Sequence, residues 1–264
     1  MQIRIKPQGN RLLPYYEMGE GDAVVLLHGF MESGAIWDDF ARALASHHRV
    51  IVPDLPGHGS APAPAESPVE MANIAEQVHK LLIHLKVQRC TLVGHSMGGY
   101  VALELVAQHH DLAKALVLFH SHAAADSEEA KANRDRAIHA VQQNHKGFVT
   151  QFIPDLFAPE NRTALKQEIA KLQEQASHIT RDTIVATMQG MKNRQCHLET
   201  LKNIQVPVLF ILGQLDSRIP VSGILEQALL PPQATLLILK HCGHMGYLEQ
   251  RTPCLNALRN IAES

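Results

Sequence analysis

The sequence predicts an α/β protein in which a mostly parallel central sheet, flanked by helices, is interrupted by an all-helical insertion. Over the first 120 residues, short apolar runs rich in β-branched residues alternate with amphipathic stretches, which is typical of strands joined by crossover helices. From about residue 123 to residue 198 no convincing strand appears, and strand signals then return. A length of 264 residues fits one domain with a subordinate insertion better than two equal domains.

The expected elements of the core follow one another in regular alternation. The run Ala23–Leu27 is continuously apolar, as expected of a strand buried on both faces. In the amphipathic stretch at 71–85, Ile74, Val78 and Leu81 recur at helical spacing. The further strands are expected at 50–52, 90–93, 115–119, 206–212 and 235–239, and the further helices at 36–45, 100–107 and 248–263.

The insertion reads as four amphipathic helices. They are expected at 127–143, 147–157, 162–177 and 180–193. Gly147, Pro154 and Pro159 mark breaks between or within them. An all-helical segment between two stretches of the same sheet is a cap, so we expect a core formed by residues 1–122 and 199–264 and a cap formed by residues 123–198.

Composition excludes several classes of function. The formal net charge is −2, and no basic block with interleaved aromatics appears, so we expect no nucleic-acid partner. No apolar run approaches the roughly 20 residues needed to span a bilayer, and the N-terminus does not resemble a signal peptide, so we expect a cytoplasmic protein without a membrane segment. The four cysteines form no CxxC pair. Although the chain has 17 histidines, adjacent pairs such as His109–His110 diverge on a helix, and we expect no metal site.

The most specific motif is Gly94-His95-Ser96-Met97-Gly98. It lies between an expected buried strand and an expected helix, where a sharp strand-to-helix turn would present the Ser96 hydroxyl at the carboxyl edge of the sheet. Small residues are needed two positions before and after such a serine, and both are glycine. The N-terminus of the following helix offers free N–H groups to an anion. This pattern favours a nucleophilic serine over an incidental one.

With the Gly94–Gly98 motif between a strand and a helix, the chain resembles the α/β-hydrolase superfamily, and it does so over nearly its whole length. In that family an acid and a base follow the serine, in that order, on later strand ends. Gly213-Gln214-Leu215-Asp216 is similar to the acid loop, and His241-Cys242-Gly243-His244 is similar to the histidine loop. His28-Gly29-Phe30 resembles the oxyanion segment, and the loop at 53–60 resembles a further, largely structural family loop.

The resemblance implies a catalytic triad of Ser96, Asp216 and His244. A serine hydroxyl needs a base to remove its proton, and His244 would supply it while Asp216 orients the imidazole. The backbone N–H groups of Phe30 and Met97 would form the oxyanion hole.

Other residues compete for these roles. Asp54 precedes Ser96 and is expected to brace its own loop, and Asp126 is a weaker alternative acid. His241 is the main rival base, although His244 fits the family pattern better. His95 is expected to pack inside the fold.

The expected reaction is hydrolysis of a small to medium carboxylic ester through an acyl-enzyme, with a small-molecule substrate and with neither cofactor nor metal. Serine rather than aspartate at position 96 excludes the epoxide-opening and halide-displacing branches of the family. Two alternatives stay open: a cofactor-free C–C bond hydrolase or perhydrolase with the same triad, and a non-catalytic ligand receptor on this fold.

The cap helices are expected to roof the pocket and select the substrate. Phe30, Phe152, Phe157 and Met188 are the expected substrate-binding side chains, and Phe148, Ile153, Leu156 and Met191 are further apolar candidates. Each of the cap residues could equally anchor the cap on the core. The sequence does not determine the preferred acyl length or the oligomeric state.

Overall fold

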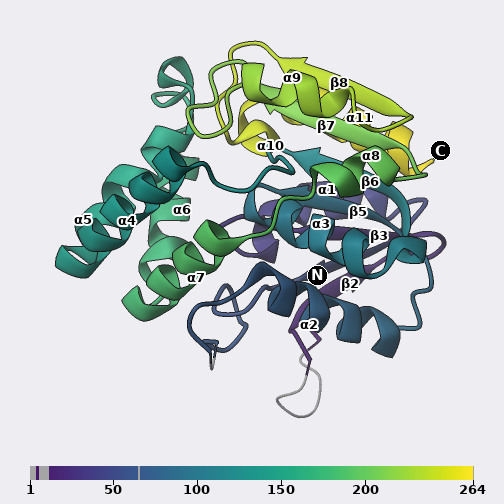
Figure 1. Ribbon diagram of the computed structural model, residues 1–264, viewed down its shortest axis with the longest axis horizontal. Coiled ribbons are helices and arrows are strands. Elements are labelled where there is room, and N and C mark those ends of the chain that lie inside the picture. Colours follow the sequence, from purple (N-terminus) through teal and green to yellow (C-terminus); the bar gives the residue numbers. More distant parts are fainter. Residues whose placement is uncertain (1–3, 6–11, 65, 264) are drawn as a thin grey trace.

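A computed structural model describes residues 4–5, 12–64 and 66–263, and the described chain is built on an eight-stranded sheet with the strand order β1-β2-β4-β3-β5-β6-β7-β8 (Figure 1). The strands are β1 (Arg4–Ile5), β2 (Tyr15–Met18), β3 (Ala23–Leu27), β4 (Arg49–Pro53), β5 (Cys90–His95), β6 (Ala113–Phe119), β7 (Val208–Gly213) and β8 (Ala234–Leu239). β1 and β2 pair antiparallel, β2 also pairs antiparallel with β4, and every pairing from β4 to β8 is parallel.

The register of the central strands brings their carboxyl ends to one edge of the sheet. Leu27 at the end of β3 lies opposite Gly94 of β5, and Phe119 of β6 lies opposite both His95 and Ile211 of its two neighbours. β3, β5 and β7 are buried along their whole length, which explains their continuous apolar sequences. The loops that leave this edge carry the residues singled out from the sequence.

The helices of the core lie on both faces of the sheet. They are α1 (Asp38–Leu44), α2 (Met71–His84), α3 (Met97–Gln108), α8 (Leu198–Asn203), α9 (Ser222–Ala228), α10 (Gly246–Glu249) and α11 (Arg251–Ala262). The chain moves one way along the sheet from β3 to β4 and the opposite way from β4 to β5, so right-handed crossovers place α1 and α2 on opposite faces. α2 packs on α3, which the same handedness places on its face, and α1 packs on α11.

Between β6 and β7 the chain forms the helices α4 (Glu128–Gln143), α5 (His145–Phe152), α6 (Lys166–Ser177) and α7 (Arg181–Asn193), which stand beside the sheet in Figure 1. α4 packs on both α5 and α7, and α5 packs on α6. The expected helix at 147–157 ends earlier, at Phe152, and a 3-10 turn (Pro154–Leu156) replaces its last part. Pro154 accounts for this, because proline cannot donate the next helical hydrogen bond.

Some elements differ from the sequence prediction. The expected helix at 248–263 is two helices, α10 and α11, divided at Gln250, whose backbone angles are not helical (φ −140°, ψ 54°). β1, β2, α8 and α9 were not predicted. All four are short, and too few residues repeat in them for a periodicity to stand out.

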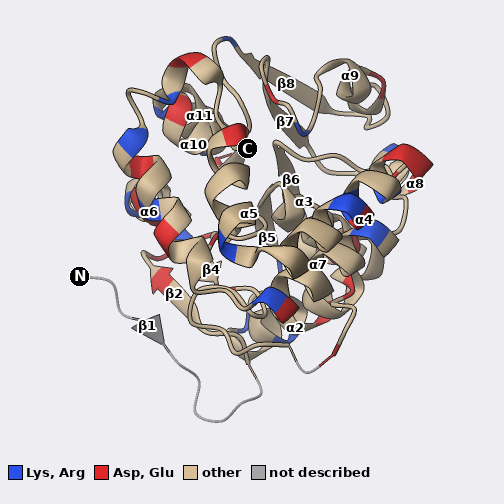
Figure 2. Cartoon of the chain, turned by 90° about the vertical axis from the view of Figure 1, so that its left-hand side faces the viewer, with Lys and Arg blue, Asp and Glu red and all other residues tan. Residues whose placement is uncertain are grey.

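Across the described residues, no helix combines the length and apolar character needed to cross a membrane. Figure 2 shows the face formed by the cap, where Lys and Arg are interspersed with Asp and Glu along α4 and α6.

Candidate active site

Ser96 lies at the sharp turn between β5 and α3, as the sequence predicts. Its backbone angles, φ 51° and ψ −114°, are strained for a residue with a side chain. A Cβ atom at Gly94 would lie 2.3 Å from the Gly98 carbonyl oxygen, and one at Gly98 would lie 2.5 Å from the Leu27 carbonyl oxygen. The two glycines therefore allow the backbone to close up behind Ser96 and leave the serine at the sheet edge.

Asp216 and His244, from the loops after β7 and β8, contact each other. His244 Nδ1 donates to Asp216 Oδ2 at 2.8 Å, which leaves Nε2 as the free ring nitrogen. The other carboxylate oxygen of Asp216 accepts from the backbone N–H groups of Arg218 (2.8 Å) and Ile219 (3.0 Å). Burial alone would raise the pKa of Asp216, but His244 and the neighbouring His120 hold it well below its ordinary value, so Asp216 is a carboxylate at neutral pH.

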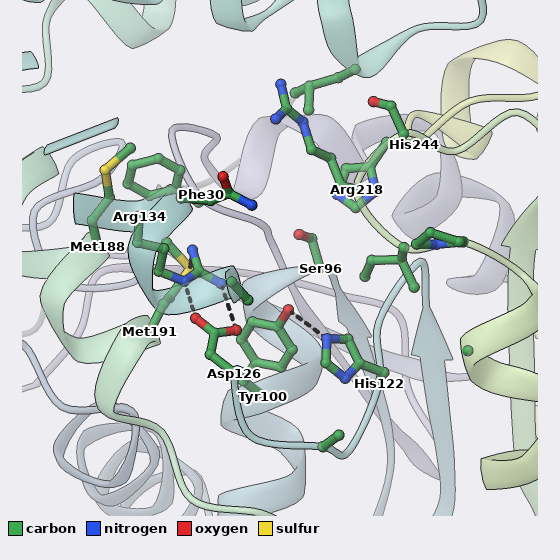
Figure 3. A pocket seen from close by; sticks show the side chains of 18 of the residues that line it. Phe30, Ser96, Tyr100, His122, Asp126, Arg134, Met188, Met191, Arg218 and His244 are labelled. Atoms are coloured by element: carbon green, nitrogen blue, oxygen red, sulfur yellow. Dashed lines mark hydrogen bonds and ion pairs between the residues drawn. The ribbon is translucent and has the colours of Figure 1, made fainter. Parts of the chain in front are cut away.

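Ser96 and His244 both line a cavity of about 740 Å³ at the carboxyl edge of the sheet, beneath the cap (Figure 3). Phe30, Phe152 and Met188 also line this cavity. The ring of Phe30 meets the ring of Phe152 edge to face, with 6.1 Å between centroids, so the loop after β3 and the cap touch across the cavity.

Phe157 does not line the cavity, contrary to the expectation that it binds substrate. The backbone is extended at Phe157 (φ −91°, ψ 147°), directly after the 3-10 turn that closes α5. Leu156 consequently faces the cavity, while Phe157 is 2% exposed and belongs to the hydrophobic core. The sequence could not separate these neighbours, because the end of α5 decides which of them faces inward.

The expected oxyanion donors come from two different segments. Met97 is the first residue of α3, and its side chain is fully buried. Phe30 lies in the loop after β3, which His28 holds in place: Nδ1 donates to the Gly29 carbonyl oxygen (2.8 Å), and Nε2 accepts from the Leu55 N–H (2.9 Å). Burial lowers the pKa of His28, which is consistent with a neutral ring in these roles.

The sequence did not predict a buried hydrogen-bond network around Glu32 and His95, close to Ser96. Glu32 is 3% exposed and accepts from the Gly29 N–H (2.6 Å), from the Tyr247 hydroxyl (2.9 Å) and from His95 Nδ1 (2.8 Å). The second ring nitrogen of His95 donates to the His244 carbonyl oxygen at 3.0 Å. Because both ring nitrogens face acceptors, His95 is an imidazolium paired with Glu32, and it joins the loop after β3 to the loop after β8.

His120 is a second histidine on the Asp216 carboxylate. Its Nδ1 lies 3.0 Å from Asp216 Oδ2, the same oxygen that His244 contacts. Burial lowers the pKa of His120 to about 4, so it is a neutral donor that fixes Asp216. In the sequence, His120 could have been recognised because it directly follows a buried strand.

Two clusters of described residues have the donor types of a metal site. One is His120, Asp216 and His244, where an ion would compete for the atoms that join His244 to Asp216. The other is Glu76, His79 and His109 on α2 and beyond α3. The rings of His79 and His109 are stacked with centroids 3.4 Å apart, and one ligand atom from each lies within 4.8 Å of the other and of one from Glu76.

The rival acids and base lie elsewhere. Asp54 accepts from the N–H groups of Gly34 and Ser60, both at 2.8 Å, and so braces its own loop. Asp126 forms ion pairs with arginines at the far wall of the cavity. His241 is exposed and contacts Glu160 rather than Asp216.

Comparisons with known proteins agree with this architecture. The family model for the alpha/beta hydrolase fold matches residues 22–250. The chain is 32% identical to the dihydrolipoyllysine-residue acetyltransferase component of the acetoin cleaving system of Pseudomonas putida, over 91% of this chain and 64% of that protein, so it spans less than two thirds of that relative. It is 26% identical to the pimeloyl-[acyl-carrier protein] methyl ester esterase of Vibrio cholerae, over 88% of this chain and 91% of that one.

A solved structure is similar over nearly the whole chain. A thermophilic esterase from Thermogutta terrifontis, in its malate-bound form, shares 28% identity and superposes with a TM-score of 0.88, covering 98% of this chain and 97% of that one. The family model, which covers most of the chain, and this structural likeness agree on the fold. The chain therefore belongs to the alpha/beta hydrolase fold family.

Proposed function

We propose that this protein is a serine esterase that hydrolyses a small to medium carboxylic ester through an acyl-enzyme. The observation that carries the proposal is the convergence of Ser96 and His244 on one cavity, with His244 Nδ1 held by the Asp216 carboxylate at 2.8 Å. An imidazole fixed in this tautomer offers Nε2 as a base to a serine hydroxyl.

The proposed reaction has two halves. His244 Nε2 takes the proton of Ser96 as its oxygen attacks the ester carbonyl carbon, and the N–H groups of Phe30 and Met97 stabilise the oxyanion. The tetrahedral intermediate expels the alcohol, which receives the proton from His244, and an acyl-Ser96 ester forms. Water, deprotonated by His244, then attacks this ester and releases the acid and the free serine.

The comparisons support an ester as substrate. Relatives that the chain matches over most of their length include methyl ester esterases, and a similar solved structure is an esterase. The cavity volume of about 740 Å³ lies in the range of pockets that hold small ligands. A carboxylic ester of modest size fits both the proposed chemistry and this space.

The first test is hydrolysis of p-nitrophenyl esters of increasing acyl length by wild type and Ser96→Ala. We expect activity in wild type and a loss of at least about 10⁴-fold in kcat in Ser96→Ala, because the nucleophile acts as a unit with its base. An active-site phosphonate should add its mass to the peptide that contains Ser96.

A different result would favour one of the alternatives. Phosphonate labelling of Ser96 without ester turnover, together with cleavage of a vinylogous diketone or peroxide-dependent chemistry, would replace the esterase by a C–C bond hydrolase or a perhydrolase. Tight ligand binding without turnover of any of these would indicate a receptor.

A further inference from the structure

The wall of the cavity carries more positive than negative charge. Besides the catalytic groups, its charged lining residues are Glu32, Asp126, Arg134 and Arg218. The charge of Glu32 is matched by His95 beneath the site. A third arginine, Arg194, lies behind the lining. Two guanidinium groups, those of Arg134 and Arg194, therefore share one carboxylate, that of Asp126.

Arg194 forms an ion pair with Asp126 and partly neutralises its charge. Its side chain is 2% exposed, forms an ion pair with Asp126, and donates to the carbonyl oxygens of Met191 (2.8 Å) and Ala124 (3.0 Å). Its guanidinium carbon also lies 4.1 Å from the centre of the Tyr100 ring. These contacts make Arg194 a structural arginine that holds Asp126 in the wall.

Arg134, from α4 of the cap, shares the same carboxylate. Its Nε and Nη2 both donate to Asp126, while the partner of Nη1 is the Met191 sulfur at 3.8 Å, a weak acceptor. One carboxylate cannot balance both Arg134 and Arg194. Arg134 therefore carries positive charge at the cavity surface that Asp126 does not fully neutralise. Its Nη1 group has only a weak hydrogen-bond acceptor.

Arg218 has no carboxylate within ion-pair distance among the described residues. Its guanidinium carbon lies 4.6 Å from the centre of the Phe152 ring, and the nearby Asp155 pairs with Arg162 at 3.3 Å. The backbone N–H of Arg218 binds Asp216, so the residue is fixed beside the triad. Burial has the largest effect on the pKa of Arg218 and lowers it, the charges of Asp155 and Asp216 oppose this, and the charge of Arg134 has the smallest effect, so the guanidinium stays charged.

Figure 3 shows the Arg134–Asp126 pair and Arg218 on different sides of the Ser96 hydroxyl. We propose that the pocket selects esters that carry a carboxylate, which Arg218 binds and whose charge Arg134 further balances. A guanidinium group matches a carboxylate with two parallel hydrogen bonds. This inference rests on the proposed esterase function and names its substrate class.

The test compares anionic esters with neutral esters of nearly equal shape. Monomethyl glutarate against dimethyl glutarate places the carboxylate in the acyl part, and O-butyryl lactate against its ethyl ester places it in the alcohol part. We expect wild type to prefer the anionic member of at least one pair by about tenfold or more in kcat/KM, as a charge-assisted hydrogen bond would produce. Equal rates within both pairs would overturn the proposal.

Variants locate the recognition. Arg218→Gln should lower kcat/KM for the anionic ester about tenfold more than for the neutral ester, since the charge is lost but the backbone N–H to Asp216 is kept. Arg134→Gln should remove a smaller part of the preference for the anionic ester. Arg181→Gln, an exposed arginine on α7 that does not line the cavity, is the matched control and should keep the full preference. Equal losses for both esters in Arg218→Gln would show a positional effect and contradict recognition of a carboxylate.

A binding measurement separates this inference from the proposed function. Calorimetry with Ser96→Ala should show tighter binding of monomethyl glutarate or O-butyryl lactate than of the neutral partner, with the difference lost in Ser96→Ala/Arg218→Gln. If wild type hydrolyses no ester but this difference is present, the esterase proposal fails and the carboxylate site stands. If wild type hydrolyses esters but no such difference is present, the carboxylate site fails and the esterase proposal stands.

Discussion

At the scale of single residues, backbone strain is concentrated where the central strands end. Met31 after β3, Ser96 after β5 and His120 after β6 all have positive φ angles, of 61°, 51° and 48°. Such conformations cost about 1–3 kcal/mol each and persist only when neighbours fix them. The Ser96 N–H donates to the Phe119 carbonyl oxygen (2.9 Å) and the His120 N–H to that of Ile211 (2.8 Å), so the parallel sheet itself holds these residues in place.

The Glu32–His95 ion pair should make the stability of the protein depend on pH. Burial alone would lower the pKa of His95, but the Glu32 carboxylate outweighs it, and the pKa lies above the ordinary value for histidine. A histidine whose pKa is raised on folding stabilises the protein fully below its unfolded pKa of about 6.5, and this contribution is lost as the pH rises through the folded value. The free energy of unfolding should therefore fall as the pH is raised through that window.

Glu32→Gln tests this pair. The substitution leaves the shape nearly unchanged but removes the charge that keeps His95 protonated, so we expect a loss of about 3 kcal/mol near pH 6, as for a broken buried pair, and a flatter dependence above that pH. Urea unfolding from pH 5.5 to pH 9 measures it. Glu160→Gln, which removes the exposed partner of His241, should reproduce the wild-type curve. An unchanged slope in Glu32→Gln would assign the pH dependence to other groups.

At the scale of elements, α10 joins the histidine loop to the cap through Glu249. One carboxylate oxygen accepts from the N–H groups of Gly243 (3.0 Å) and Met245 (3.1 Å), on either side of His244. The other accepts from the Ala158 N–H and from Asn161 Nδ2, both at 2.8 Å. The position of the expected base is thus coupled to the cap segment above it, although the two are far apart in sequence.

Glu249→Gln should loosen this connection. An amide can replace only part of the four charge-assisted contacts, so we expect a loss of about 1–3 kcal/mol in stability. We also expect a decrease of about tenfold in kcat, because a modest displacement of the base is costly in rate. Thermal unfolding and ester turnover measure the two effects. Glu226→Gln on the exposed surface of α9 is the matched control; a fall in stability with unaltered kcat would mean that Glu249 supports the cap without positioning His244.

At the scale of the whole molecule, the cavity belongs to both parts of the chain. The sheet edge supplies Ser96, His244 and Phe30, whereas α5 and α7 supply Phe152 and Met188. Because the apolar wall opposite the serine comes from the inserted helices, the insertion should determine which acyl chains fit.

Met188→Ala should enlarge the cavity and shift the preferred acyl chain of p-nitrophenyl esters to a greater length. Met71→Ala is the matched control, because Met71 is equally buried but lies in the core of α2 away from the cavity. Both substitutions should cost about 2–5 kcal/mol, as for a large buried side chain, and only the first should move the length profile. Profiles that coincide in the two variants would contradict selection by the cap.

The sequence by itself determined the parallel α/β core and its helical insertion, because continuous apolar strands and helical periodicity are local patterns. It also identified Ser96, Asp216 and His244 as candidates, since each stands in a short motif directly after a strand and parallel strands bring such ends to one edge. Only the tertiary structure decided that His95 pairs with Glu32, that Asp216 has His120 as a second partner, and that Arg134 and Arg194 meet on Asp126 at the cavity. Partners separated by tens of residues have no local pattern, because packing and the crossing of the cap over the sheet, rather than periodicity, bring them together. The same reason explains Phe157: whether a cap residue faces the cavity or the core depends on where α5 ends against its neighbours.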